Sequence, residues 1–271
     1  MTAAVAENVS EQSDEMKSHG ASAVSFSGIR KSFGSNQVLC GVSFSCASHS
    51  ATALIGANGS GKSTLLRCSL RLIEPDAGSI HVFGKSVREL SAGELRKVRS
   101  QVGFVFQKHN LVSRLSALTN VIHGAIGQGY SFRAWYQSIA PSELRERAFA
   151  CLERVGLSDF ALKPVQTLSG GQSQRVAIAR AVFQKPKLIL ADEPAASLDP
   201  ESGQQVMELL RELTQSEGIG LIFSTHHIDH ALEFADRVVA LKSGTIDFES
   251  APDKLDATEL RKFYMPSGSP L

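Results

Sequence analysis

The sequence contains no apolar stretch long enough to cross a membrane. No run of about 18 apolar residues occurs anywhere in its 271 residues. The N-terminal segment carries the acidic residues Glu7, Glu11, Asp14 and Glu15 in place of the apolar block of a signal peptide. We therefore expect a chain that is soluble by itself, so that any membrane role needs a partner, and a disordered extension over residues 1–22.

An excess of charge of one sign and closely spaced cysteines are also missing. Lysine and arginine together number 28 against 27 acidic residues, so the overall balance gives no reason to expect a nucleic-acid partner. The four cysteines show no CxxC spacing, and we interpret them as small core residues in a reducing compartment. They are Cys40, Cys46, Cys68 and Cys151.

Segments with strand and helix character alternate along most of the chain. Two β-rich pieces, at 24–26 and 42–45, precede an apolar strand at 51–55 and predict an antiparallel β subdomain. Helices then alternate with buried strands, which is typical of an α/β fold with a mainly parallel core sheet covered on both faces. The expected helices span about 62–72, 171–184 and 200–216, and the expected strands 79–83, 102–106, 188–191, 221–223, 238–241 and 245–248.

Residues 111–167 interrupt this alternation. They are rich in helix formers, as in the stretch 143–148, and lack the alternation of a strand. We expect a helical subdomain there, within one α/β domain over 23–250. The remaining residues, 251–271, form a C-terminal tail that we expect to fray.

Residues 56–64 match the phosphate-loop (P-loop) pattern GxxxxGK[ST] between a strand and a helix. Glycines let successive backbone N–H groups surround a phosphate, Lys62 adds a positive charge, and Ser63 offers an oxygen to Mg²⁺. The alternative is a glycine-rich turn without a ligand. The segment consists of Gly56, Ala57, Asn58, Gly59, Ser60, Gly61, Lys62, Ser63 and Thr64.

Two carboxylates follow the apolar strand at 188–191. Ligands of parallel sheets lie beyond the carboxyl ends of the strands, so Asp192 would emerge beside the P-loop and hold Mg²⁺ through its waters. Glu193 would point toward the γ-phosphate side and polarise an attacking water. The alternative is an acidic strand end before the turn at Pro194, which a P-loop in the same chain disfavours.

The segment 168–172 has the sequence Leu-Ser-Gly-Gly-Gln at the start of a predicted helix. The paired glycines and the hydroxyl at this helix start make a second anion site, with Ser169 suited to cap the helix and amides free. An ordinary capped helix with a Gly-Gly turn is the alternative. With this segment, the chain resembles the ATP-binding cassette (ABC) ATPase family over residues 25–249, since Leu-Ser-Gly-Gly-Gln is that family's signature.

The resemblance assigns roles to further residues. It implies that Phe33 stacks on adenine, although an aromatic residue in a strand is more often part of a core. It implies that Gln107 contacts Mg²⁺ and links the site to the helical subdomain, where the alternative is a surface amide. It also implies that His226 contacts the γ-phosphate and that the loop 197–199 communicates across a dimer, while His227 receives no role.

In this family two cassettes pack head to tail around ATP. The resemblance therefore implies a second copy of the chain, whose Ser169, Gly170, Gly171 and Gln172 act on the nucleotide held by its partner. Hydrolysis would consist of positioning and charge stabilisation of an in-line water attack, with Lys62 and Mg²⁺ neutralising the phosphates.

A single cassette without a membrane segment is similar to the ATPase subunit of an importer. The segments 110–121 and 191–202 resemble the phosphonate-import ATPases, while importers of phosphate or amino acids share much of the pattern. This implies a peripheral location on the cytoplasmic face of the cell membrane, membrane permease subunits docked on 111–135, and an indirect solute-binding protein. A soluble translation or repair ATPase fits less well because those carry tandem cassettes or long coiled coils, and intact Glu193 and His226 disfavour a non-hydrolysing switch.

Overall fold

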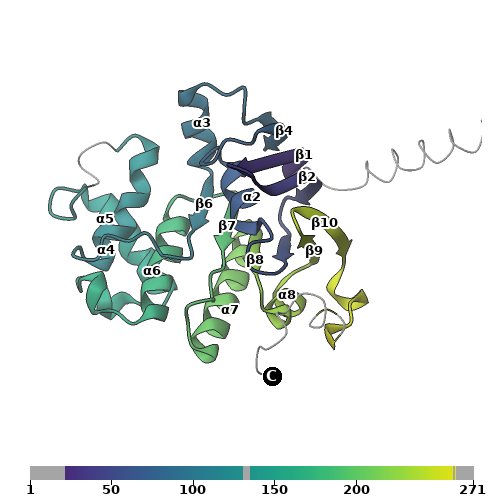
Figure 1. Ribbon diagram of the computed structural model, residues 1–271. Coiled ribbons are helices and arrows are strands. Elements are labelled where there is room, and N and C mark those ends of the chain that lie inside the picture. Colours follow the sequence, from purple (N-terminus) through teal and green to yellow (C-terminus); the bar gives the residue numbers. More distant parts are fainter. Residues whose placement is uncertain (1–21, 131–134, 259, 261–271) are drawn as a thin grey trace, which may run out of the picture.

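Two β-sheets form the framework of the chain in the computed structural model, which describes residues 22–130, 135–258 and 260 (Figure 1). The smaller sheet has the strand order β2-β1-β4-β5, and each neighbouring pair is antiparallel. The predicted antiparallel layer is therefore present, but its first two strands are longer than predicted because β-bulges let them continue through residues that break the alternation. The strands are β1 (Ser22–Phe33), β2 (Asn36–Ala47), β4 (Ala77–Val82) and β5 (Lys85–Ser86).

The larger sheet has the order β10-β9-β3-β8-β7-β6. Its neighbours from β9 to β6 are parallel, and β10 adds an antiparallel edge. Every residue of β3, β6, β7 and β8 is buried, as expected for parallel strands covered on both faces. This arrangement confirms the predicted α/β fold with a mainly parallel core sheet. The strands are β3 (Ala51–Ile55), β6 (Val102–Val105), β7 (Leu188–Asp192), β8 (Gly220–Thr225), β9 (Arg237–Lys242) and β10 (Thr245–Ser250).

Most helices match the sequence prediction, with three differences. α2 ends at Ser69 and Arg71 has a left-handed φ of 51°, so the helix is shorter than the predicted 62–72. α3 and α8 were not predicted, although Ser91 and Glu94 form a capping box at the start of α3 that the sequence displays. The α-helices are α2 (Lys62–Ser69), α3 (Ala92–Arg99), α4 (Ala117–Ile122), α5 (Ser142–Arg154), α6 (Gly170–Phe183), α7 (Pro200–Glu217) and α8 (Ile228–Phe234), and 3₁₀ helices span η1 (His123–Gln128), η3 (Ser158–Phe160), η4 (Val165–Thr167) and η5 (Pro252–Lys254).

Helices α4 and α5 pack with α6 in a lobe beside the larger sheet (Figure 1). In α5 the residues Leu144, Ala148 and Leu152 recur at helical spacing and are completely buried. The regular elements described within 111–167 are thus helices, as predicted, while 131–134 lie outside the described residues. The predicted extension (residues 1–21 of it) and most of the predicted tail also lie outside them, so those domain limits stay a prediction.

The larger sheet separates two hydrophobic cores. In β3, Ala53 and Ile55 belong to the core that includes the helical lobe, whereas Leu54 belongs to the core under the antiparallel sheet. Alternate residues of β7 divide in the same way, because side chains of a strand point to opposite faces. The loops at the strand ends therefore start from a sheet that is fixed on both sides.

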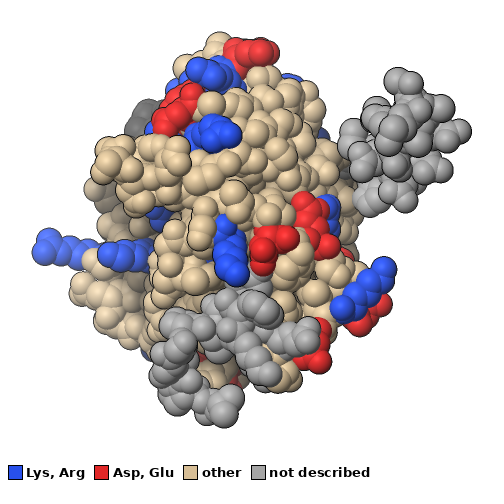
Figure 2. All heavy atoms as spheres, turned by 45° about the vertical axis from the view of Figure 1, so that its right-hand side comes forward, with Lys and Arg blue, Asp and Glu red and all other residues tan. Residues whose placement is uncertain are grey.

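None of the helices in the described ranges is long and apolar enough to span a membrane. On the face drawn in Figure 2, basic and acidic side chains lie interspersed among uncharged residues. Two of the cysteines, Cys46 and Cys68, are buried as predicted, while Cys40 and Cys151 are half-buried.

Candidate active site

The carboxyl ends of three parallel strands bring the predicted site residues together. Register pairs Ile55 of β3 with Thr225 of β8, and Asp192 of β7 with Ser224 of β8. The P-loop follows β3, Glu193 follows β7, and His226 follows β8. The edge of the sheet thus supplies a loop, two carboxylates and a histidine to one place, as the rule for parallel sheets predicts.

Glycines shape the P-loop where no other residue fits. A Cβ on Gly56 would lie 2.3 Å from the carbonyl oxygen of Leu241, and one on Gly61 would lie 2.7 Å from the Leu39 side chain; both residues have positive φ. Gly61 is the N-cap of α2 and offers no side-chain cap, so the first amides of the helix stay free. The Ser60 hydroxyl is buried without a hydrogen-bond partner among the described residues. These features fit a bound anion.

Lys62 is the first residue of α2, and only 4% of its side chain is exposed. Its Nζ donates to the carbonyl oxygens of Gly56 at 2.7 Å and Ala57 at 3.2 Å, and it lies 3.8 Å from Oε1 of Glu193. Burial lowers the pKa of Lys62, and the charges of Glu193 and Asp192 oppose that shift. The ammonium group is thus held by two neutral carbonyl oxygens and one carboxylate. A bound phosphate can replace these partners.

Asp192 is completely buried, and within the described part of the chain its carboxylate is surrounded by hydrogen-bond donors. Oδ1 accepts from Oγ of Ser63 at 2.7 Å and from Oγ of Ser224 at 3.0 Å, and Oδ2 accepts from Nη2 of Arg67 at 3.2 Å. Mg²⁺ prefers hard oxygen ligands. The site offers three: the carboxylate of Asp192, the hydroxyl of Ser63 and the side-chain amide oxygen of Gln107, whose Nε2 donates to Glu193. The donor set therefore fits the predicted metal.

Glu193 lies between Lys62, Gln107 and His226. Its backbone has a left-handed φ of 48°. Its Oε2 accepts from Nε2 of Gln107 at 3.2 Å and lies 3.7 Å from Nδ1 of His226, which is too far for a hydrogen bond. The neighbouring His226 ring, and then the charge of Lys62, lower the pKa of Glu193 although burial alone would raise it. Glu193 is thus a carboxylate at neutral pH.

Phe33 ends β1 with half of its surface exposed, so it is not a core residue. Lys31 lies over its ring, with Nζ 5.4 Å from the centroid. Asp76 fixes this strand end, since it accepts from Nζ of Lys31 and from N–H of Ser32, each at 2.7 Å. The ring is therefore available to stack on a ligand.

The predicted signature segment lies at the start of α6. Ser169 and Gln172 form a reciprocal capping box, with bonds of 3.0 and 3.2 Å. Ideal Cβ positions on Gly170 and Gly171 would lie 3.3 Å from Leu198 and Ser202, so the loop 197–199 and the start of α7 lie against the segment. A hollow of about 230 Å³ opens beside Ser169. Ser169 and Gly170 are exposed to solvent, as are Ala57, Asn58 and Gly59 at the tip of the P-loop.

Comparison with known proteins agrees with this geometry. The ABC transporter family matches residues 39–196, more than half of the chain. The chain belongs to the ABC transporter family. This confirms the resemblance drawn from the P-loop and signature segments.

Individual relatives of this ABC protein cover nearly all of it. A phosphonates import ATP-binding protein of Nitratidesulfovibrio vulgaris is 43% identical over 94% of this chain and 97% of its own. A hypophosphite import ATP-binding protein of Stutzerimonas stutzeri is 41% identical over 91% of this chain and 72% of its own. Among solved structures, CbiO1 from Clostridium perfringens has a TM-score of 0.75 at 30% identity, covering 86% of this chain and 90% of its own. A dimeric ATP-binding cassette in a post-hydrolysis state with ADP and Pi has a TM-score of 0.73 at 34% identity, covering 84% and 98%.

The structure of this ABC ATPase also reveals site residues that the sequence did not predict. Arg67 pairs with Asp192, and Ser224 contacts both Asp192 and Glu193. Behind His226, the rings of His227 and His230 continue a row of histidines with centroid distances of 4.3 and 5.1 Å. The sequence predicts that Arg67 lies on the helix that follows the P-loop, five residues after Lys62. Only the tertiary structure reveals that its side chain reaches Asp192.

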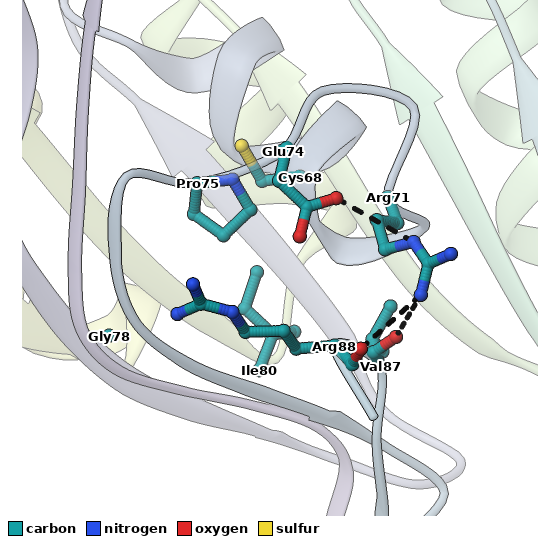
Figure 3. A pocket seen from close by; sticks show the side chains of 8 residues that line it. All are labelled: Cys68, Arg71, Glu74, Pro75, Gly78, Ile80, Val87 and Arg88. Atoms are coloured by element: carbon teal, nitrogen blue, oxygen red, sulfur yellow. Dashed lines mark hydrogen bonds and ion pairs between the residues drawn. The ribbon is translucent and has the colours of Figure 1, made fainter. Parts of the chain in front are cut away.

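A second hollow lies behind α2 and is not a ligand site. It holds about 10 Å³, room for one water molecule at most. Figure 3 shows Arg71 closing it, through an ion pair with Glu74 and hydrogen bonds to the carbonyls of Val87 and Arg88. Burial raises the pKa of Cys68, on its wall, to about 11, so the thiol stays protonated and unreactive.

Proposed function

We propose that this chain is the ATP-hydrolysing subunit of an importer for phosphonates or a closely related phosphorus oxyanion. The observation that carries the ATPase assignment is the cluster of Lys62, Asp192 and Glu193 at the P-loop. The solute assignment rests on relatives named as phosphonates and hypophosphite import proteins, which align over most of the chain.

The hydrolytic roles follow from the positions of the side chains. Lys62 and the amides of the P-loop hold the phosphates of ATP. Glu193, an ionised carboxylate within reach of Gln107 and His226, accepts the proton of an attacking water. His226 then orients the γ-phosphate, and the exposed ring of Phe33 stacks on adenine.

Ser63, Asp192 and Gln107 would hold Mg²⁺ at this site. The ion would neutralise charge on the phosphates when bound. Arg67 balances the buried charge of Asp192 from the side away from Ser63, at 3.2 Å.

A second copy of the chain would complete each ATP site. Ser169 and Gly170 are exposed at the start of α6, where free amides can face a nucleotide held by the partner. The dimeric cassette among the solved structures supports this arrangement.

Permease subunits would dock between the helical lobe and the core. A groove of about 420 Å³ has apolar residues, including Leu72 and Phe106, beside the arginines Arg96 and Arg99. Its other wall comes from η1 and from Arg180 of α6, so the predicted docking segment 111–135 supplies one side of the groove only. Such a groove suits a short amphipathic helix of a cytoplasmic permease loop, and this docking would hold the chain at the cytoplasmic face of the cell membrane. A solute-binding protein would act on the permease from the other side.

The solute is tested with the assembled complex. ATPase rates of reconstituted chain and permease would be measured with solute-binding protein and a phosphonate, phosphite, phosphate, an amino acid or a sugar. We expect stimulation by the phosphorus oxyanions, together with loss of growth of a deletion strain on phosphonate as sole phosphorus source. Stimulation by an amino acid or sugar alone would contradict the solute proposal and leave the ATPase proposal standing.

A further inference from the structure

A single buried hydroxyl connects the two carboxylate residues of the site. Ser224 lies in β8, is completely buried, and pairs across the sheet with Asp192. Its Oγ donates to Oδ1 of Asp192 at 3.0 Å and accepts from N–H of Glu193 at 2.9 Å. A hydroxyl can make both bonds because it has one donor and two acceptor lone pairs. Alanine could make neither.

The bond to Glu193 acts on the backbone at a strained residue. A non-glycine residue with φ of 48° keeps that conformation only where its surroundings fix it. The N–H of Glu193 belongs to the peptide plane between Asp192 and Glu193, so the Ser224 hydroxyl sets the orientation of that plane. The direction in which the Glu193 side chain leaves the backbone depends on the same plane.

The Glu193 carboxylate has little else to hold it in place. Its neighbours Lys62 and His226 lie at 3.8 and 3.7 Å, beyond hydrogen-bond distance. Among the residues that the structure describes, its one side-chain hydrogen bond comes from the exposed Gln107 at 3.2 Å. Positioning of this group therefore depends largely on its backbone.

The bond to Asp192 has a second consequence. Ser63 and Ser224 both donate to Oδ1 of Asp192. In the proposed site the Ser63 hydroxyl also binds Mg²⁺. Ser224 binds no metal, so its hydroxyl can keep donating to Oδ1 of Asp192. It keeps the Asp192 carboxylate in one orientation while Ser63 changes partner.

We propose that Ser224 is a positioning residue that orients the backbone of Glu193 and the carboxylate of Asp192 through one hydroxyl. This inference rests on the proposed roles of Glu193 and Asp192. It gives Ser224 no contact with ATP itself, and the hydrogen bonds of its hydroxyl go to Asp192 and Glu193 rather than to the P-loop. Loss of the hydroxyl should therefore affect turnover and the Mg²⁺ requirement more than ATP affinity.

The test compares Ser224→Ala with the parent protein, with Ser224→Thr as the variant that keeps the hydroxyl. We expect Ser224→Ala to lower kcat about 10–100-fold, the usual effect of losing a group that orients a metal ligand. The KM for ATP should stay within about threefold, since the lost interaction orients reacting groups rather than binding substrate. Ser224→Thr should recover most of kcat.

A binding measurement adds a readout that does not depend on turnover. In Glu193→Gln protein, the Mg²⁺ concentration that half-saturates binding of a fluorescent ATP analogue should rise when Ser224→Ala is added. Ser69→Ala is the matched control, because Ser69 is equally buried but its hydroxyl donates only within its own helix, to Leu66 at 2.6 Å. It should change neither kcat nor the Mg²⁺ requirement.

The outcomes separate this inference from the proposed function. If Glu193→Gln hydrolyses ATP like the parent, the assignment of Glu193 itself fails. If Glu193→Gln is inactive but Ser224→Ala keeps parental kcat and Mg²⁺ dependence, or if Ser69→Ala loses as much, Ser224 has no positioning role. Should Ser224→Ala not fold, Ser224→Cys preserves the shape with a weak hydrogen-bonding group and is expected to show the same loss; parental kcat in Ser224→Cys would equally refute the inference.

Discussion

Replacing Glu193 with glutamine should separate ATP binding from ATP hydrolysis. The amide has the shape of the carboxylate and can still accept from Nε2 of Gln107, whose bond to Glu193 is 3.2 Å long. It cannot take a proton from water at neutral pH. The substitution therefore removes the proposed base while it leaves the neighbouring geometry in place.

The expected loss follows from the role of a general base. Such groups contribute about 10²–10⁴-fold to the rate, or about 3–5 kcal/mol of barrier. ATP affinity should not fall, because the phosphates no longer compete with a carboxylate 3.8 Å from Nζ of Lys62. The lowered pKa of Glu193 adds a pH signature. Because the ionised form is the active one, titration of Glu193 should cause no loss of kcat in the parent as pH falls from about 8 to about 5.

Two assays test this on the purified chain or the reconstituted complex. Phosphate release measures kcat, and a fluorescent ATP analogue measures affinity. Glu153→Gln is the matched control, since Glu153 is an exposed residue of α5 in the helical lobe. A Glu193→Gln protein that turns over within about tenfold of the parent would refute the reasoning, as would a loss of ATP affinity that accounts for the whole defect.

Three further predictions concern the P-loop, the signature and the sheet. Lys62→Ala should weaken ATP binding itself in an isotherm, because the phosphates lose their fixed positive charge; unchanged affinity would mean that the loop is structural. Mg²⁺ and ATP should drive Glu193→Gln protein to a dimer in sedimentation, and Ser169→Arg should prevent it; a monomer at saturating ATP would contradict the head-to-tail site. Burial would raise the pKa of Asp236, but Arg211 and the N–H of Ala51 lower it overall. Asp236→Asn should therefore cost about 1 kcal/mol of unfolding free energy at pH 7, a modest value for a partly exposed pair, and denaturant titrations should show that difference vanish as pH falls through the lowered pKa.

The sequence predicted the elements whose local pattern and tertiary role agree. β3 and β7 were predicted at nearly their observed limits because uniformly apolar segments end at a glycine loop or a carboxylate pair. Their site residues followed from the rule that ligands lie at the carboxyl ends of parallel strands.

Other parts depend on contacts between distant segments. α8 has seven residues and begins without a side-chain cap, so its local signal is weak. Ser224 is 31 residues from Glu193 and becomes its partner only because β7 and β8 pair in one register. The docking groove likewise combines residues from the segment just after α2 with residues from α3, β6, η1 and α6, which no single window of sequence can reveal.

Helix α6 joins two surfaces that were described separately. Its first residues carry the signature segment, and Arg180, near its last residue, lines the groove beside the helical lobe. The helix has 14 residues and is therefore about 20 Å long. Arg180 also donates to the carbonyls of His109 and Asn110, just beyond Gln107. Because α6 is a rigid helix, it moves as a whole. A partner that binds in the groove and tilts the helical lobe would therefore displace the signature segment. Through Arg180 it would also shift the segment after β6 that contains Gln107. The coupling would also act in the opposite direction. Closure of two cassettes on ATP would move the signature segment, and α6 would carry that movement to the groove where the permease is proposed to dock.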